Sequence, residues 1–84
     1  MTRAEAYALI DAERARQADL WAAPHRWGAG DCSSLLVHDI TKVAVLAEEC
    51  GEVARAVLND DIPGLREELV QVAAVAVAWL EALS

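Results

Sequence analysis

Residues 34–58 read SLLVHDITKVAVLAEECGEVARAVL, and this stretch decides the fold. Its apolar side chains recur at the 3.6-residue period of an α-helix. We expect one stripe of them to be the core-facing side of that helix: Leu36, Ile40, Val43, Ala47, Ala54 and Leu58. Asp31, Ser33 or Ser34 would cap the helix start. Gly51 costs about 1 kcal/mol against alanine inside a helix, so we expect it to mark a close helix approach or room at a site.

Another helix, the first of the chain, is predicted before this stretch, which then forms the second. Thr2 and Glu5 have the spacing of a capping box, which indicates a helix start, and the helix should run to about Trp21. Residues 22–33 contain one proline and two glycines, so they are predicted to form a loop.

A third helix should follow the polar turn at residues 59–64, with Asp60 or Asp61 as its N-cap. Residues 72–80 are apolar on every side of this helix, which three helices of one chain cannot easily cover. A bundle formed between subunits can cover them. The expected fold is therefore all-α: one domain, residues 1–84, whose three helices join an oligomeric assembly of the four-helix-bundle type.

Charge and composition narrow the class of partner. The 84 residues carry a net charge of −7, and the basic residues form no patch, which argues against a nucleic-acid polymer. The longest unbroken apolar run, Val72 to Leu80, is well short of the roughly 20 residues of a membrane span. Cys32 and Cys50 form no cysteine-rich framework, so we expect reduced thiols and a cytoplasmic location.

Acidic side chains mark the candidate site. Glu49 and Glu52 share one face of the second predicted helix, and Glu68 and Gln71 share one face of the third. Antiparallel packing would bring these four side chains together. Carboxylates held against an apolar seam repel one another unless a cation neutralises them, and hard oxygen ligands select Mg²⁺ or Mn²⁺. Glu48 lies on another edge of its helix. It should point toward solvent, or contact the metal ligands without binding the metal itself.

This arrangement resembles a known family. Glu49-x-x-Glu52 followed, after a short break, by Glu68-x-x-Gln71 is similar to the E-x-x-E and E-x-x-D motifs of the MazG-like, all-α nucleoside triphosphate pyrophosphohydrolases. The segment at residues 13–17 also looks like small members of that family. The resemblance implies a homodimer or homotetramer, Mg²⁺ dependence, and hydrolysis of a nucleoside triphosphate to a monophosphate and pyrophosphate. It implies as metal ligands Glu49, Glu52, Glu68 and Gln71.

Gln71 departs from the family pattern. An amide oxygen can bind a hard cation but brings no charge and cannot act as a base. Three carboxylates remain for one Mg²⁺, and Glu48 or Glu52 is the better candidate for the catalytic base. The alternative is a non-catalytic oligomeric helix bundle with a structural or vestigial metal site, or with glutamates that only solvate the surface.

Four other residues are candidates for binding the nucleotide. Lys42 lies two turns before Glu49 and suits a phosphate, although it could equally form a salt bridge. Trp27 could stack on a nucleobase. Arg14 and Gln17 lie on one side of the first helix and could reach phosphate or base, or could serve as a salt-bridge partner and a solvated amide.

Overall fold

The computed structural model describes residues 1–83, and three helices dominate it, as the sequence predicts. A two-stranded antiparallel hairpin, in which Pro24 faces Ala29, interrupts the loop between the first two helices. The elements in chain order are α1 (Arg3–Leu20), β1 (Pro24–His25), β2 (Gly28–Ala29), α2 (Asp39–Leu58) and α3 (Ile62–Ala82).

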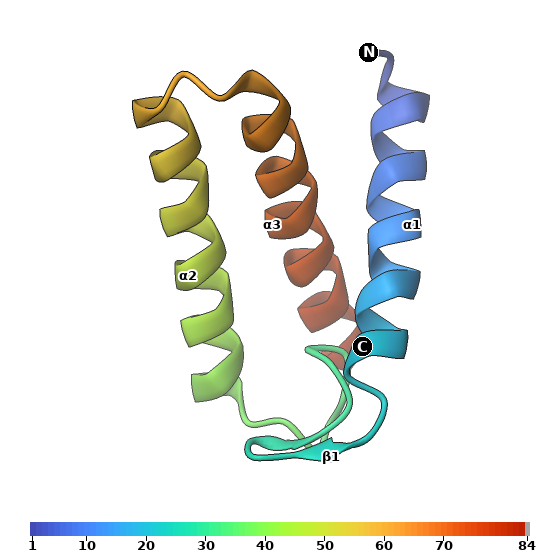
Figure 1. Cartoon of the computed structure of the whole chain (residues 1–84). Coiled ribbons are helices and arrows are strands. Elements are labelled where there is room, and N and C mark those ends of the chain that lie inside the picture. Colours follow the sequence, from blue (N-terminus) through green and yellow to red (C-terminus); the bar gives the residue numbers. More distant parts are fainter. Residues whose placement is uncertain (84) are drawn as a thin grey trace.

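The three helices form a single layer with α3 in the middle (Figure 1). The chain runs down α1, through the hairpin at the lower end, up α2 and back down α3. Helix α3 packs against both α1 and α2, whereas α1 and α2 do not pack directly on each other in the described part of the chain. Helix α3 is therefore antiparallel to α2, the arrangement that the candidate site requires.

Two of the predicted helix starts are confirmed. The Thr2 side chain accepts from the Glu5 backbone N–H at 3.1 Å, and Glu5 accepts in return from the Thr2 N–H, which completes the capping box. Asp61 caps α3 by accepting from the Gly64 N–H at 3.0 Å. Each cap satisfies backbone donors that a helix start would otherwise leave unpaired.

The predicted start of α2 was wrong. The helix begins at Asp39, and His38 is its N-cap, with the imidazole Nδ1 accepting from the Ile40 N–H at 3.1 Å. The short polar residues expected to cap it fold local turns instead. Asp31 accepts from the Ser33 N–H and hydroxyl at 2.9 and 2.5 Å, and Ser34 Oγ accepts from the Leu36 N–H at 3.0 Å. Such side-chain bonds compete with helix formation.

The predicted core stripe of α2 was also wrong. All of its members are exposed, Leu58 by 83% and Ile40 by 75%. The opposite side of α2 faces α3, and Val45 and Leu46 pack there on a small core of Cys32, Val75 and Ala78. Periodicity identifies an apolar stripe but does not say what covers it. Helix α2 has two such stripes, and α3 covers the other one.

Gly51 does not mark a close approach of helices. It is exposed, and a Cβ atom at this position would meet nothing within 4 Å. Gly28 is the glycine that geometry requires. Its φ is +130°, and a Cβ atom there would collide with the Leu36 carbonyl oxygen. The hairpin and the segment before α2 can pass this closely only because residue 28 has no side chain.

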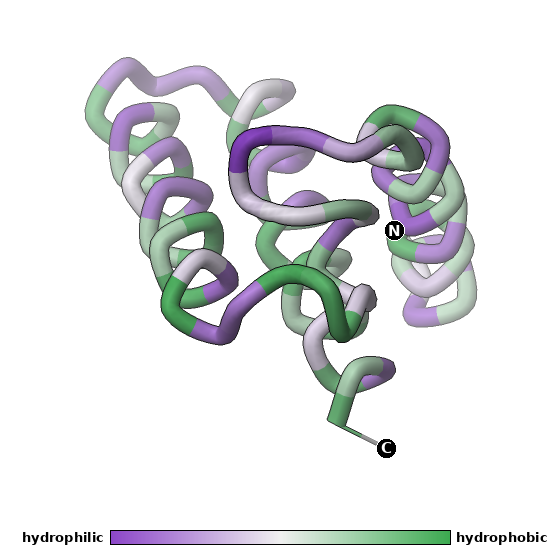
Figure 2. Tube along the Cα trace, turned by 90° about the horizontal axis from the view of Figure 1, so that it is seen from below, coloured by the Kyte–Doolittle hydropathy of each residue, from purple (hydrophilic) through white to green (hydrophobic). Residues whose placement is uncertain are grey.

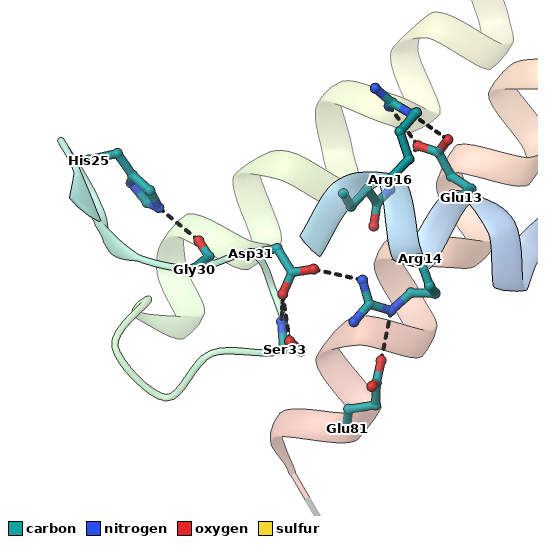
Figure 3. Close-up of polar contacts among 9 residues, drawn as sticks. Glu13, Arg14, Arg16, His25, Gly30, Asp31, Ser33 and Glu81 are labelled. Atoms are coloured by element: carbon teal, nitrogen blue, oxygen red, sulfur yellow. Dashed lines mark hydrogen bonds and ion pairs between the residues drawn. The ribbon is translucent and has the colours of Figure 1, made fainter. Parts of the chain in front are cut away.

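Polar contacts fasten the hairpin end of the molecule to α3 (Figure 3). The Arg14 guanidinium donates through Nη1 to Asp31 at 2.6 Å and through Nε to Glu81 at 2.7 Å. The Trp79 indole N–H donates to Asp39 Oδ1 at 3.0 Å and so joins the end of α3 to the start of α2.

Among residues 1–83, no helix has the length and hydropathy needed to cross a membrane. Both cysteines are free, Cys32 buried and Cys50 exposed.

Candidate functional site

Antiparallel packing of α2 and α3 brings two carboxylates into contact. Glu49 lies midway along α2, and its carboxyl group meets that of Glu68, which lies on the facing side of α3. Gln71, one turn further along α3, bridges them. In the orientation that satisfies its donors and acceptors, the amide nitrogen donates to Glu49 Oε2 at 2.7 Å and to Glu68 Oε2 at 3.2 Å.

The surroundings of Glu49 raise its pKa. Burial raises the pKa of Glu49 to about 7, and the hydrogen bond with Glu68 and the negative charges of Glu68, Glu48 and Glu52 act in the same direction. Nearby like charges disfavour the ionised form, so Glu49 retains a proton to higher pH than an ordinary glutamate does. A cation that replaced this proton would relieve the same repulsion.

The other two glutamates lie further out. Glu52 is half-buried on the same face of α2, with its Oε1 3.6 Å from the Arg55 guanidinium. Glu48 is exposed, so the doublet of Glu48 and Glu49 is divided between surface and site. Within residues 1–83, no three His, Cys, Asp or Glu side chains lie close enough together to hold a metal ion. The inner set is two carboxylates and one amide.

A groove of about 450 Å³ opens next to this set, between α1 and α3. Gln71 is one of its walls and connects it to the carboxylate pair. Two arginines line it, Arg16 from α1 and Arg66 from α3. Arg16 is held by a two-pronged pair with Glu13, both bonds 2.7 Å long (Figure 3), and its charge also interacts with Glu49. Glu13 and Glu67 also line the groove, so it places two guanidinium groups and two carboxylates beside the paired acids.

A family model for the MazG nucleotide pyrophosphohydrolase domain matches residues 38–82. The match covers more than half of the chain and includes all of α2 and α3, the helices that carry the paired glutamates. The chain belongs to the MazG nucleotide pyrophosphohydrolase domain family. Comparisons with curated proteins and with solved structures gave no match.

MazG-family membership implies a divalent metal, and the inner residues fit one. Glu49 and Glu68 converge as hard oxygen donors, and the raised pKa of Glu49 marks the place where positive charge is needed. Gln71 can add a neutral amide oxygen. Two carboxylates suit Mg²⁺, which keeps several waters and rarely takes a complete set of protein ligands.

The structure distributes the four expected nucleotide-binding residues around the molecule. Lys42 is buried two turns from Glu49, toward the hairpin end, and is not brought to the carboxylate pair. Arg14 is committed to its two acidic partners. Gln17 Nε2 donates to Glu13 at 3.3 Å. Trp27 is half-exposed in the hairpin under the Arg26 guanidinium, 5.5 Å from the ring centroid.

The sequence reasoning missed Arg16 and Arg66. One signal was available, because Arg66 immediately precedes the Glu67-Glu68 doublet and Arg16 lies in the segment that resembles the family. Their convergence on one groove depends on how α1 packs against α3. Helical periodicity within each segment cannot supply that relation.

Proposed function

We propose that this member of the MazG family hydrolyses a nucleoside triphosphate to the monophosphate and pyrophosphate, with Mg²⁺ bound by Glu49 and Glu68. The contact between these two carboxylates, with the pKa of Glu49 raised to about 7, carries the proposal. A protein has little reason to hold two acids together at a cost in repulsion unless a cation is to occupy the site.

The groove supplies the complementary half of the site. A triphosphate lying between α1 and α3 would meet the Arg66 guanidinium group and, by exchange with Glu13, that of Arg16; guanidinium groups match phosphate oxygens in shape and charge. Gln71 stands between these arginines and the paired acids. This arrangement would let the phosphates approach a protein whose net charge is −7.

Roles for the remaining acids follow from their positions. Bound Mg²⁺ would neutralise charge on the phosphate oxygens and lower the pKa of an attacking water. Glu52, half-buried on the same face as Glu49, is the carboxylate best placed to accept that water's proton. Glu48 is exposed and would contribute its negative charge from further away.

A non-catalytic bundle is the second candidate, and Gln71 favours it. Its amide donates to both glutamates, so it stabilises the pair without metal and without charge. In that case the hydrogen-bonded cluster would serve structure alone. The two candidates differ in what Mg²⁺ does to the protein.

The test is pyrophosphate release from canonical and modified nucleoside triphosphates, with and without Mg²⁺. We expect release that needs Mg²⁺ and that falls at least 100-fold in Glu49→Gln and in Glu68→Gln, because loss of a metal ligand should exceed the roughly 10–100-fold loss typical when a residue that only supports a ligand is changed. Asp11→Asn, which removes an exposed charge from α1, is the control and should retain full activity. Absence of release from every triphosphate, with a melting temperature unaffected by Mg²⁺, would favour the non-catalytic bundle.

A further inference from the structure

Lys42 is the largest fully buried side chain among residues 1–83, with only 2% of its surface exposed. Within residues 1–83, the Lys42 ammonium group has no hydrogen-bond acceptor and no carboxylate partner. Burying a charge without a partner is costly, and a lysine kept in this position therefore points to a ligand.

The ammonium group has one open side. Every wholly buried side-chain nitrogen or oxygen of the described residues has a hydrogen-bond partner. The Lys42 nitrogen has no such partner among these residues, so it keeps an opening to solvent. Lys42 lines a pocket of about 260 Å³ where the start of α2 meets the end of α3. The apolar segment before α2 and the end of α3 lie at this lower end of the molecule (Figure 2), and Leu35, Val37 and Leu83 wall the pocket.

A second donor faces the same pocket. His38 Nδ1 accepts the Ile40 N–H at 3.1 Å, so a neutral imidazole carries its proton on Nε2. His38 lines the pocket together with Lys42. Both stand at the N-terminus of the α2 helix, where the helix dipole favours negative charge. Asp39 also lines the pocket, but one of its oxygens accepts the Trp79 indole N–H at 3.0 Å.

We propose that this pocket binds a small oxyanion, a phosphate or carboxylate group, through Lys42 and His38. A volume of about 260 Å³ is below the range of pockets for drug-sized ligands and suits a small anion rather than a whole nucleotide. Two helical turns, about 10 Å, separate Lys42 from Glu49. The anion site is therefore distinct from the paired carboxylates and does not depend on the function proposed for them.

The test uses inorganic phosphate and acetate as probes, titrated separately into ¹⁵N-labelled protein at pH 7.5 without divalent metal. Sodium chloride at matched ionic strength is the blank. We expect saturable shifts of the backbone amides of residues 38–42 and 83 with phosphate, with acetate, or with both, and this pattern tells which oxyanion the site takes. No saturable shift with either probe would overturn the proposal.

Variants assign the binding to the two donors. Lys42→Met keeps the length of the side chain without the charge and should weaken binding about tenfold or more. His38→Ser retains an oxygen to cap α2 but removes the Nε2 donor, and it should weaken binding about fivefold. Arg3→Met removes an exposed charge at the far end of α1 and should change nothing. An affinity in Lys42→Met equal to that of the unmutated protein would contradict the site. A loss of affinity in Arg3→Met as large as that in Lys42→Met would also contradict it. If Lys42→Met fails to fold, the titration of His38→Ser decides between these outcomes.

Discussion

At the scale of single residues, Glu49 shows how packing changes the acidity of an ordinary side chain. The sequence places it correctly on the face shared with Glu52, but it does not reveal that Glu68 and the Gln71 amide would both bond to it. The result is a close pair of carboxyl groups at the α2 and α3 interface, in which the pKa of Glu49 is raised to about 7. Predictions about acidity and metal binding belong to this pair.

Stability without metal should depend on pH through Glu49. Its pKa is raised from 4.5 to about 7, so the folded state binds the proton more tightly than the unfolded state does. The free energy of unfolding should therefore be highest at low pH with respect to this group and should decline as pH rises from about 4.5 to about 7. Melting temperatures between pH 4.5 and 8, for the unmutated protein and for Glu49→Gln, measure this contribution. An identical pH profile in the two proteins would contradict the raised pKa.

Substitution of Gln71 by aspartate separates its two roles. Asp cannot donate to Glu49 and Glu68, so Gln71→Asp should lower the melting temperature in the absence of metal. It should also raise Mn²⁺ affinity and hold or increase triphosphate turnover, because a third carboxylate offsets dehydration of the ion. Calorimetric Mn²⁺ titration and turnover assays on both proteins provide the comparison. Weaker Mn²⁺ binding in Gln71→Asp, with no turnover in either protein, would support the non-catalytic bundle.

At the scale of elements, the sequence predicted three helices and two of their caps, since capping boxes and Asp-Ile-Pro turns are local signals. It failed at the start of α2, where Ser34 and Asp31 could cap a helix or fold a turn and the tertiary contact of Asp31 with Arg14 selects the turn. It failed again for the core stripe, because a second helix decides which stripe is covered. The contact between Glu49 and Glu68 was predictable, because helical spacing and antiparallel packing set it. The position of Arg16 near this pair was not predictable, because only the packing of α1 against α3 brings it there.

Two glycines give opposite predictions about element stability. Gly51→Ala should stabilise the protein by about 0.5–1 kcal/mol, because the added methyl group meets open space in an α-helix and alanine loses less entropy on folding. Gly28→Ala should be strongly destabilising, because it combines positive φ with a collision against the Leu36 carbonyl. Urea unfolding of both variants tests the pair. A destabilised Gly51→Ala variant would mean that another chain covers this part of α2.

At the scale of the whole molecule, one layer of three helices leaves much apolar surface uncovered. The exposed stripe on α2 includes Ile40 and Val43, and α3 exposes Leu69, Val77 and Leu80. Apolar stripes of this extent are unusual on a monomer. We expect a second copy of the chain to cover them, in a homodimer or homotetramer of the four-helix-bundle type.

Charge substitutions locate the surface of association. Val43→Glu on α2 and Val77→Glu on α3 each place a charge on an exposed apolar stripe, and one buried between subunits would cost several kcal/mol. The variant at the interface should reduce the mass measured by light scattering to that of one chain. Ala15→Glu, on the exposed side of α1, is the matched control and should leave the mass unchanged. A single-chain mass for the unmutated protein would contradict this expectation.

We expect Glu49 to exchange its proton for a divalent cation that it binds together with Glu68. Calorimetric titration of Mn²⁺ at pH 7, in two buffers with different heats of ionisation, measures both the binding and the protons released. With the pKa of Glu49 near 7, we expect saturable binding that releases about half a proton per ion, and loss of both effects in Glu68→Gln. Absence of saturable binding, or binding that releases no proton and is unchanged in Glu68→Gln, would contradict this exchange of a proton for a metal ion.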